Sequence, residues 1–313
     1  MIRLEHTLIL SPQLSPTEAR IVVTASVTEE EEASSDRPRL EGSVIGPLCE
    51  YAVTLSSRVA LRPWEEPVGL GPKRTRLTAT ARILEPCFWE PQHPFCYEIS
   101  LELRSEDRLL DMRRIIAGIR HLAIQAKELF LNGQEFFLDG VRHAETATVA
   151  ELEAWHEAGC GALLADASSG LCERTDRWGP MVLHLLAPKQ TDARDQVLRL
   201  RNHPSLLMWV VPPGISAGYS HGFLASIRAQ DPSRPIGQLV PVNQPTSVAN
   251  QVDVLFLSAS HAEVGSAQPS KPYVVVADDE TGHCYCSNQD FREQAAELRE
   301  GLGARPGLVG VIL

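Results

Sequence analysis

An acidic cluster directly follows one of the most apolar stretches of the sequence. Asp278, Asp279 and Glu280 come immediately after YVVVA at residues 273–277. Carboxylates at the end of a buried strand can hold a hydroxyl group of a ligand or act as a nucleophile, and this is the functional interpretation of the cluster. The alternative is an acidic loop in water at the end of a strand. The sequence leaves both interpretations open.

Three further polar groups stand after apolar segments of the same kind. His143 and Glu145 follow residues 136–141, and Asp166 lies near the end of residues 162–167. The carboxyl group of Asp166 could donate a proton if burial raised its pKa, and its simpler role would be the N-cap of a helix. His143 is interpreted either as a ligand-binding group or as a hydrogen-bonded structural histidine.

An aromatic side chain and a proline-rich break end another apolar segment. Trp209 lies in LLMWVV at residues 206–211, and Pro212, Pro213 and Gly214 follow directly. Trp209 is interpreted either as a flat platform for a ligand ring or as a core residue of a strand. A segment of this kind usually brings a functional side chain to the end of a strand, but here it brings two prolines and a glycine.

Metal and cofactor sites are not predicted. The word HCYC at residues 283–286 supplies two cysteines and a histidine, and it lacks the second pair of ligands that a structural zinc site needs. The sequence contains no P-loop, no Gly-x-Ser-x-Gly and no His-Glu-x-x-His. We therefore expect no metal and no cofactor.

Composition and charge exclude several classes of protein. The 313 residues are 43% hydrophobic and 22% charged, as in a globular protein that fills a core. A formal net charge of -11 and the lack of a basic run argue against nucleic-acid binding. Apolar runs are too short to span a membrane, and the N-terminus does not resemble a signal peptide. With seven irregularly spaced cysteines, we expect reduced thiols and a cytoplasmic location.

The first part of the chain has the pattern of an antiparallel sheet. Apolar and polar residues alternate in the predicted strands 20–27, 51–57, 76–83 and 97–103. Breakers separate them: the acidic run at 29–32, RPWEEPVGLGP at 62–72 and EPQHP at 90–94. Residues 1–122 are therefore predicted to form an immunoglobulin-like β-sandwich.

In the second part, residues 123–313, short apolar segments alternate with helical segments. Eight apolar strands are predicted at 136–141, 162–167, 181–187, 206–211, 236–241, 253–259, 273–279 and 308–313. Helices are predicted at 148–159, where Thr148 and Glu151 are placed as a capping box, and at 192–201, 222–230 and 290–302. This order indicates a small (β/α)8 TIM barrel. A doubly wound open sheet is the alternative, but it would need a glycine-rich turn after its first strand.

A set of short sequence motifs, called words below, occurs in a fixed order along the chain. The words are FWEPQHPFCYEISLEL at 88–103, AGIRHLAI at 117–124, LFLNGQEFFLDGVRH at 129–143, TDRWGPMVL at 175–183, RNHPSLLMW at 201–209 and DPSRPI at 231–236. In this order they resemble glycoside hydrolase family 2, the β-galactosidase and β-glucuronidase group. The resemblance covers residues 88–313 closely and residues 1–87 only as a sandwich. It implies a member without the jelly-roll domain that usually precedes the sandwich.

The resemblance implies chemistry with two carboxyl groups, an acid/base and a nucleophile. Counted from Trp209, the Asn-Glu pair that carries the acid/base falls on Pro213 and Gly214, which have no proton to donate from a side chain. On the second strand, Leu164 and Ala167 stand where the family places an arginine and a histidine.

The predicted seventh and eighth barrel strands can also be compared with the family's motifs. The word KPYVVVADDETG at 271–282 resembles the strand that leads to the family's nucleophile. When the family's spacing is counted along this motif, the position of the nucleophile falls on Ala277. If the alignment is shifted by one residue, it falls on Asp278. The last strand ends at Leu313 without the family's tryptophan.

Two functions remain open on the sequence. The first is a degenerate family member that has lost glycosidase activity and retains the binding of a carbohydrate or of a protein partner. Its candidate sugar-binding residues would be His143, Glu145, Asp166 and Trp209. The second is an active retaining β-glycosidase whose acid/base has moved to Asp166, to Glu145 or to the cluster at 278–280. Neither the oligomeric state nor a specific partner can be predicted.

Overall fold

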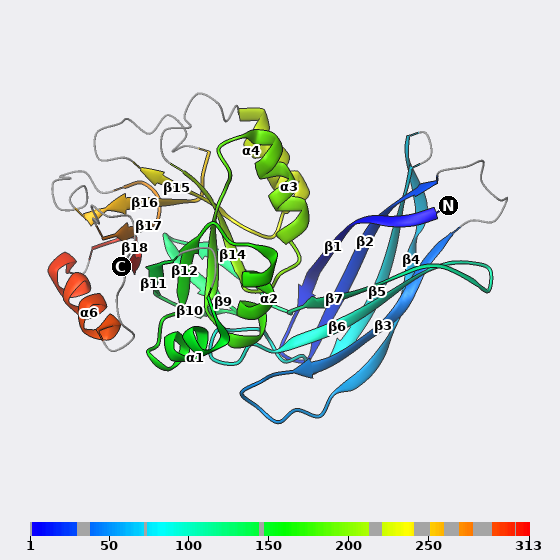
Figure 1. The fold of residues 1–313 in the computed structure, drawn as a ribbon, viewed down its shortest axis with the longest axis horizontal. Coiled ribbons are helices and arrows are strands. Elements are labelled where there is room, and N and C mark those ends of the chain that lie inside the picture. Colours follow the sequence, from blue (N-terminus) through cyan, green and yellow to red (C-terminus); the bar gives the residue numbers. More distant parts are fainter. Residues whose placement is uncertain are drawn as a thin grey trace. The chain divides into compact units, whose positions relative to one another are not determined.

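The computed structural model describes residues 2–29, 38–71, 74–143, 147–212, 221–240, 251–259, 269–277, 290–303 and 305–313. The chain divides into two compact units, which Figure 1 labels by element. The first unit holds Met1–Arg120 with Arg201–Pro204, and the second holds His121–Leu200 with Ser205–Leu313. No helix within the described ranges is long and apolar enough to cross a bilayer.

The first unit is an antiparallel, sandwich-like sheet in the order β1-β2-β5-β4-β3-β6-β7. Its strands are β1 Ile2–Leu14, β2 Glu18–Glu29, β3 Arg39–Leu48, β4 Ser57–Gly71, β5 Arg74–Leu84, β6 Cys96–Ser105 and β7 Arg108–Ala117. The long strand β4 pairs with β3 through residues 57–61 and with β5 through residues 62–71. One strand therefore belongs to both layers, and the predicted sandwich is confirmed.

Three of the four strands predicted here are confirmed, and the strand at 51–57 is wrong. Residues 51–56 form a loop in which the hydroxyls of Thr54 and Ser56 donate to the carbonyl of Pro47 at 2.7 and 2.9 Å. Such local bonds compete with a strand ladder, and they leave Val53 and Leu55 exposed.

The segment 62–72 was predicted to be a break between strands, and that prediction is also wrong. Residues 62–71 form the second half of β4 and pair with β5. The register shifts between Pro63 and Glu65 and again between Glu65 and Val68. Bulges of this kind let prolines lie within a sheet.

The unpaired edge of β1 is hydrogen-bonded by side chains of the RNHPS motif at residues 201–205. The backbone N–H of Ile9 donates to Oδ1 of Asn202 at 3.0 Å, and Nδ2 of Asn202 donates to the carbonyl of Thr7 at 2.9 Å. The guanidinium of Arg201 donates to the same carbonyl. The asparagine amide thus takes the place of a neighbouring strand and protects an edge that would otherwise be free to pair.

The second unit is a closed parallel barrel of eight strands. They are β11 Leu138–Arg142, β12 Ala162–Ala165, β13 Met181–Leu185, β14 Leu206–Val211, β15 Ile236–Val240, β16 Val254–Ser258, β17 Tyr273–Val276 and β18 Leu308–Ile312. Strand β11 pairs with both β12 and β18, so the open-sheet alternative is excluded. The small antiparallel sheet that precedes the barrel comprises β8 Leu122–Gln125, β9 Glu128–Leu131 and β10 Gln134–Glu135.

Helices surround the barrel (Figure 1). They include α1 Val149–Glu157, α2 Ser169–Trp178, α3 Gln190–Leu200, α4 His221–Gln230 and α6 Phe291–Leu302. The predicted capping box is present: Thr148 accepts from the Glu151 N–H, and the Glu151 carboxylate accepts from the Thr148 N–H. The four predicted helices are confirmed, and α2 was not predicted.

The two faces of the barrel strands can be assigned from the register. Successive residues of a strand alternate between faces, and Cα partners in parallel strands share a face. The outer face packs against the helices in one cluster that includes Leu163, Trp209 and Phe291. On the inner face, a Cβ added to Gly237 would lie 2.5 Å from the ring of Phe256, so this glycine makes room for the ring.

The barrel interior is apolar along the described strands. Its buried inward residues include Leu138, Ala162, Leu164, Met181, Leu183, Met208, Val210, Phe256, Val274, Val276 and Ile312. Polar groups can therefore reach a ligand only at the ends of the strands. In parallel barrels the functional end is the C-terminal one.

Candidate functional site

The C-terminal ends of the barrel strands bring a small set of polar side chains to the mouth. Following the inward face of each strand leads to Arg142 on β11, Asp166 after β12 and Ser258 on β16. The corresponding positions on β13 and β14 are Leu185 and Pro212. The described part of the mouth therefore offers a guanidinium, a carboxylate and a hydroxyl.

Asp166 is exposed and is held from the side by a glutamine. Nε2 of Gln196, on α3, donates to Oδ1 of Asp166 at 3.3 Å, and Oε1 of Gln196 accepts from the Ala187 N–H at 2.8 Å. The role of Asp166 as a helix N-cap is wrong. Ser168 caps α2, because its hydroxyl accepts from the Leu171 N–H at 3.2 Å. The Asp166 carboxylate therefore stays available at the mouth.

A buried histidine fixes the backbone beside Asp166. His184, on the outer face of β13, accepts a hydrogen bond at Nδ1 from the Ala167 N–H at 3.1 Å. The ring must be neutral to accept there, and burial lowers the pKa of His184 to about 4. The nearby side chain of Gln196 acts in the opposite direction and raises the pKa of His184. The Gln196 amide itself is hydrogen-bonded to Asp166 and Ala187 and not to the imidazole ring.

The low pKa of His184 predicts a loss of stability in acid. The folded-state pKa of about 4 lies below the ordinary value of 6.5, so the folded chain binds fewer protons than the unfolded chain. Stability is complete above the ordinary value and falls as the pH drops toward about 4, by about 3 kcal/mol in total. His184→Asn keeps an acceptor for Ala167 and does not titrate, so it should remove this part of the pH dependence.

Urea unfolding of both proteins at about pH 7.5 and about pH 4.5 measures the effect. His93→Asn provides the control for the loss of a histidine from an exposed position. If His184→Asn loses as much stability in acid as the wild type does, the neutral buried imidazole is not the cause.

Arg142 is a candidate that the sequence analysis missed. It is half-buried, and its Cα partner on β12 is Leu164, the position at which the resemblance implied an arginine. The signal was present in the period of two along β11, since Leu138, Gly140 and Arg142 occupy one face. The residue following it, His143, has the more obvious chemistry, and Arg142 was not considered.

The other sequence candidates differ in how far they can be placed. His143 follows β11 and is half-buried, and its N–H donates to the Leu164 carbonyl at 3.0 Å. It therefore stays a candidate at the mouth. The remaining candidates, Glu145, Asp278, Asp279 and Glu280, lie outside the described residues, as do Pro213, Gly214 and the word HCYC. Elsewhere in the described ranges no group of three His, Cys, Asp or Glu side chains is arranged to hold a metal ion.

Trp209 is not a platform for a ligand, and that prediction is wrong. Its side chain has no exposed surface, and it packs edge-on against the ring of His184 with 5.6 Å between centroids. Its indole N–H donates to Oδ2 of Asp231 at 3.0 Å. The indole is a core residue between the barrel and its helices, and it has no free face for a sugar ring.

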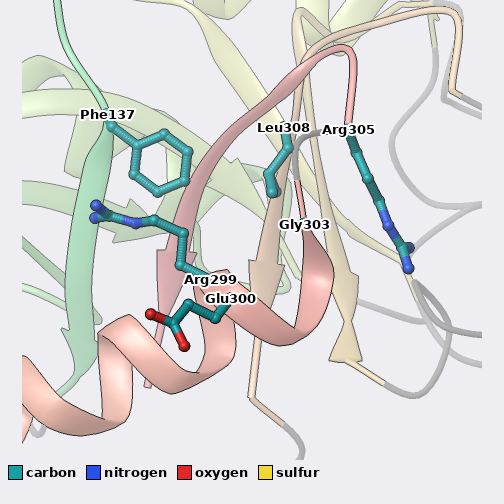
Figure 2. Close-up of a pocket in the computed structure, with 6 residues that line it drawn as sticks. All are labelled: Phe137, Arg299, Glu300, Gly303, Arg305 and Leu308. Atoms are coloured by element: carbon teal, nitrogen blue, oxygen red, sulfur yellow. The ribbon is translucent and has the colours of Figure 1, made fainter.

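A cavity of about 410 Å³ lies at the opposite end of the barrel (Figure 2). It is lined by Phe137, Arg299, Glu300, Gly303, Arg305 and Leu308, near the starts of β11 and β18. The guanidinium of Arg299 stacks 4.5 Å above the Phe137 ring and pairs with Asp139. Its charge is thus already satisfied within the fold, and the cavity is remote from the polar groups of the mouth.

Comparison with known proteins supports the assignment of the fold. A glycosyl hydrolase family 2 member from Bacteroides cellulosilyticus matches 99% of this chain with a TM-score of 0.74 and 19% identity. A β-glucuronidase from Bifidobacterium dentium, solved with coumarin-3-O-glucuronide, matches 100% with a TM-score of 0.71 and 15% identity. The chain shares the fold of glycoside hydrolase family 2.

Sequence comparison gives a match over a smaller part of the chain. A β-galactosidase from Oenococcus oeni is 24% identical over 223 residues, which cover 60% of this chain and 21% of that protein. The chain also spans only 44% and 60% of the two solved structures. No family model matches the sequence. The predicted resemblance to glycoside hydrolase family 2 is thus confirmed at the level of the fold.

The motifs at 201–209 and 231–236, which carry part of the family resemblance, form a buried hydrogen-bond network around β14. Asp231 is fully buried and accepts hydrogen bonds from Trp209, from Arg234 at 2.9 Å and from Ser233 at 2.8 Å. Arg234 in turn donates to the Leu206 carbonyl at 2.6 Å. These groups fix both the start and the middle of the strand.

A second network joins the word at 175–183 to the start of the same strand. Buried Asp176, on α2, accepts from the N–H and the hydroxyl of Ser205 at 3.0 and 2.6 Å. The hydroxyl of Thr175 donates to the Ser205 hydroxyl at 2.9 Å. The words that carry the family resemblance therefore specify the scaffold of β14 in this chain.

Proposed function

We propose that this chain is a carbohydrate-binding relative of glycoside hydrolase family 2 in which the glycosidase reaction has been lost. One observation carries the proposal: β14 is held firmly in its place in the barrel, yet the sequence after Val211 is Pro212-Pro213-Gly214. None of these three residues has a side-chain proton to give to a leaving group. Loss of a general acid typically lowers a rate by about 10²- to 10⁴-fold.

The described part of the mouth supports the same proposal. A retaining glycosidase needs two carboxyl groups about 5 to 5.5 Å apart. Within the described ranges, the inward positions at the strand ends include the carboxylate of Asp166 and no second carboxylate. Leu185 and Pro212 occupy the neighbouring positions. These groups suit the binding of a polar ligand better than acid/base chemistry.

Carbohydrate is the proposed ligand because of the fold and the polar groups at the mouth. Binding sites in barrels lie at the C-terminal ends of the strands, where the structure places Arg142, Asp166 and Ser258. We keep the cytoplasm as the proposed location. The described cysteines are thiols that form no disulfide with one another, which supports a reducing compartment.

The alternative function is an active glycosidase with a relocated acid/base. Asp166 favours it, because this exposed carboxyl group lies at the mouth. The alternative needs a second carboxyl group across the mouth within about 10 Å, the limit even for inverting enzymes. Glu145 or the cluster at 278–280 would have to supply that group.

Hydrolysis of aryl β-glycosides tests the proposal. We expect no release of the phenol above the rate in buffer, from galactosides, glucosides or glucuronides alike, while a titration with the same sugars shows saturable binding. Variants Asp166→Asn and Asp278→Asn should leave the absence of turnover unchanged. Turnover in the wild type that either variant abolishes would contradict the proposal and establish the active alternative.

A further inference from the structure

We infer that Arg142 and Asp166 together form a binding site for a neutral, hydroxyl-rich sugar ring at the mouth of the barrel. The inference rests on the proposed function and deepens it, because it names the groups that hold the ligand and the class of sugar that fits them. It places the site on β11 and β12, away from β14, where the resemblance predicted the acid/base.

The register places the two residues at the ends of neighbouring strands. Arg142 pairs with Leu164 across β11 and β12, and Asp166 follows Leu164 by two residues on the same inward face. Ion pairs found within the described ranges do not join Arg142 to Asp166. The two residues therefore stand at neighbouring strand ends, and both charges remain available to a ligand.

Both groups have hydrogen-bonding capacity to spare. The guanidinium of Arg142 carries five N–H donors, is half-buried, and makes no side-chain hydrogen bond to any described residue. Asp166 accepts one bond, from Gln196, and a carboxylate can accept about four. Half-burying a charge without partners is costly, so oxygen atoms of a ligand would stabilise this arrangement.

The carboxylate is held in place before a ligand arrives. Gln196 binds its Oδ1 atom, and the Ala187 N–H fixes the glutamine in turn. His184 binds the N–H of Ala167, the residue next to Asp166. Support of this kind lowers the entropy lost on binding, and it distinguishes Asp166 from a carboxylate that is free in water.

The charges select a neutral sugar. The site adds one positive and one negative charge, and the whole chain carries a net charge of -11. A sugar hydroxyl can accept from Arg142 and donate to Asp166, so adjacent hydroxyls of one ring can satisfy both groups. The carboxylate of a uronide would be attracted by the guanidinium of Arg142 and repelled by the like charge of Asp166. The site should therefore prefer neutral hexopyranosides to uronides.

Titration of the full chain tests the inference, with the methyl β-glycosides of galactose, glucose and glucuronic acid as probes and NMR or calorimetry as the readout. Arg142→Met and Asp166→Asn should each weaken the binding of the neutral sugars by about tenfold or more, the effect of losing a hydrogen bond to a charged group. Arg194→Met and Asp195→Asn, at exposed positions on α3, are the matched controls and should bind as the wild type does.

Each outcome of the titration has a separate meaning. If the wild type binds none of the sugars, the proposed function fails and the inference fails with it. If the wild type binds but Arg142→Met and Asp166→Asn bind equally well, the inference fails and the proposed function stands. If the glucuronide binds more tightly than the neutral sugars, the assignment of the ligand class is overturned. Circular dichroism of each variant confirms that it is folded.

Discussion

Replacing Asp231 by alanine should lower the free energy of unfolding by about 3 to 5 kcal/mol, the cost of breaking a buried ion pair from one side. The carboxylate has no exposed surface, and its partner Arg234 is 7% exposed. Without Asp231, the guanidinium of Arg234 and the indole N–H of Trp209 would stay buried with a partner missing. The effect should be large because several groups depend on one carboxylate.

Chemical denaturation of the variant and the wild type measures this loss. Glu18→Ala is the control, because Glu18 pairs with Arg82 at 2.6 Å on an exposed surface, where ion pairs contribute little. Asp231→Asn keeps the acceptor oxygen and should lie between the wild type and the alanine variant. A loss for Asp231→Ala as small as that of the control would show that β14 does not depend on this network.

Replacing Asp176 by alanine should cost about 3 kcal/mol, because the N–H and the hydroxyl of Ser205 would both lose a charged acceptor inside the core. Asp176 is 1% exposed and Ser205 is fully buried, so water cannot take over these bonds without local opening. The hydroxyl of Thr175, which donates to Ser205, should be perturbed as well.

The same denaturation experiment measures this effect, with Asp192→Ala at the exposed start of α3 as the control. Ser205→Ala removes the hydroxyl but keeps the backbone N–H, so its loss should be smaller than that of Asp176→Ala. Equal stability of Asp176→Ala and the wild type would contradict a structural role for the word at 175–183.

The barrel could be predicted from the sequence because its strands are short, apolar and separated by turn or helix signals. LLMWVV at residues 206–211 is one example, and it coincides with β14. Strands buried on both faces must be apolar throughout, so burial leaves a clear trace in the sequence. The capping box of Thr148 and Glu151 was equally clear, because its spacing follows directly from helix geometry.

Other features could not be predicted because tertiary contacts decide them. YAVTLSS at 51–57 alternates like a strand, yet two hydroxyls bind the Pro47 carbonyl and hold a loop. Helix α2 is mostly polar, and its buried Asp176 becomes intelligible only once Ser205 is beside it. Arg142 could be assigned to the mouth only after the register of β11 was known. Trp209 shows the converse, since an aromatic side chain near a predicted site belongs to the core.

The central claim, that the glycosidase reaction has been lost, is tested most directly by a fluoroglycoside with a dinitrophenyl leaving group. This leaving group departs without a general acid, so the missing acid after β14 cannot by itself prevent an adduct. The reagent therefore tests the other half of the account, that the mouth presents no carboxylate placed to attack a sugar as a nucleophile. After long incubation, the intact mass of the protein is measured. We predict an unchanged mass. A stable glycosyl adduct on a carboxylate at the mouth, such as Asp166 or Asp278, would contradict the account.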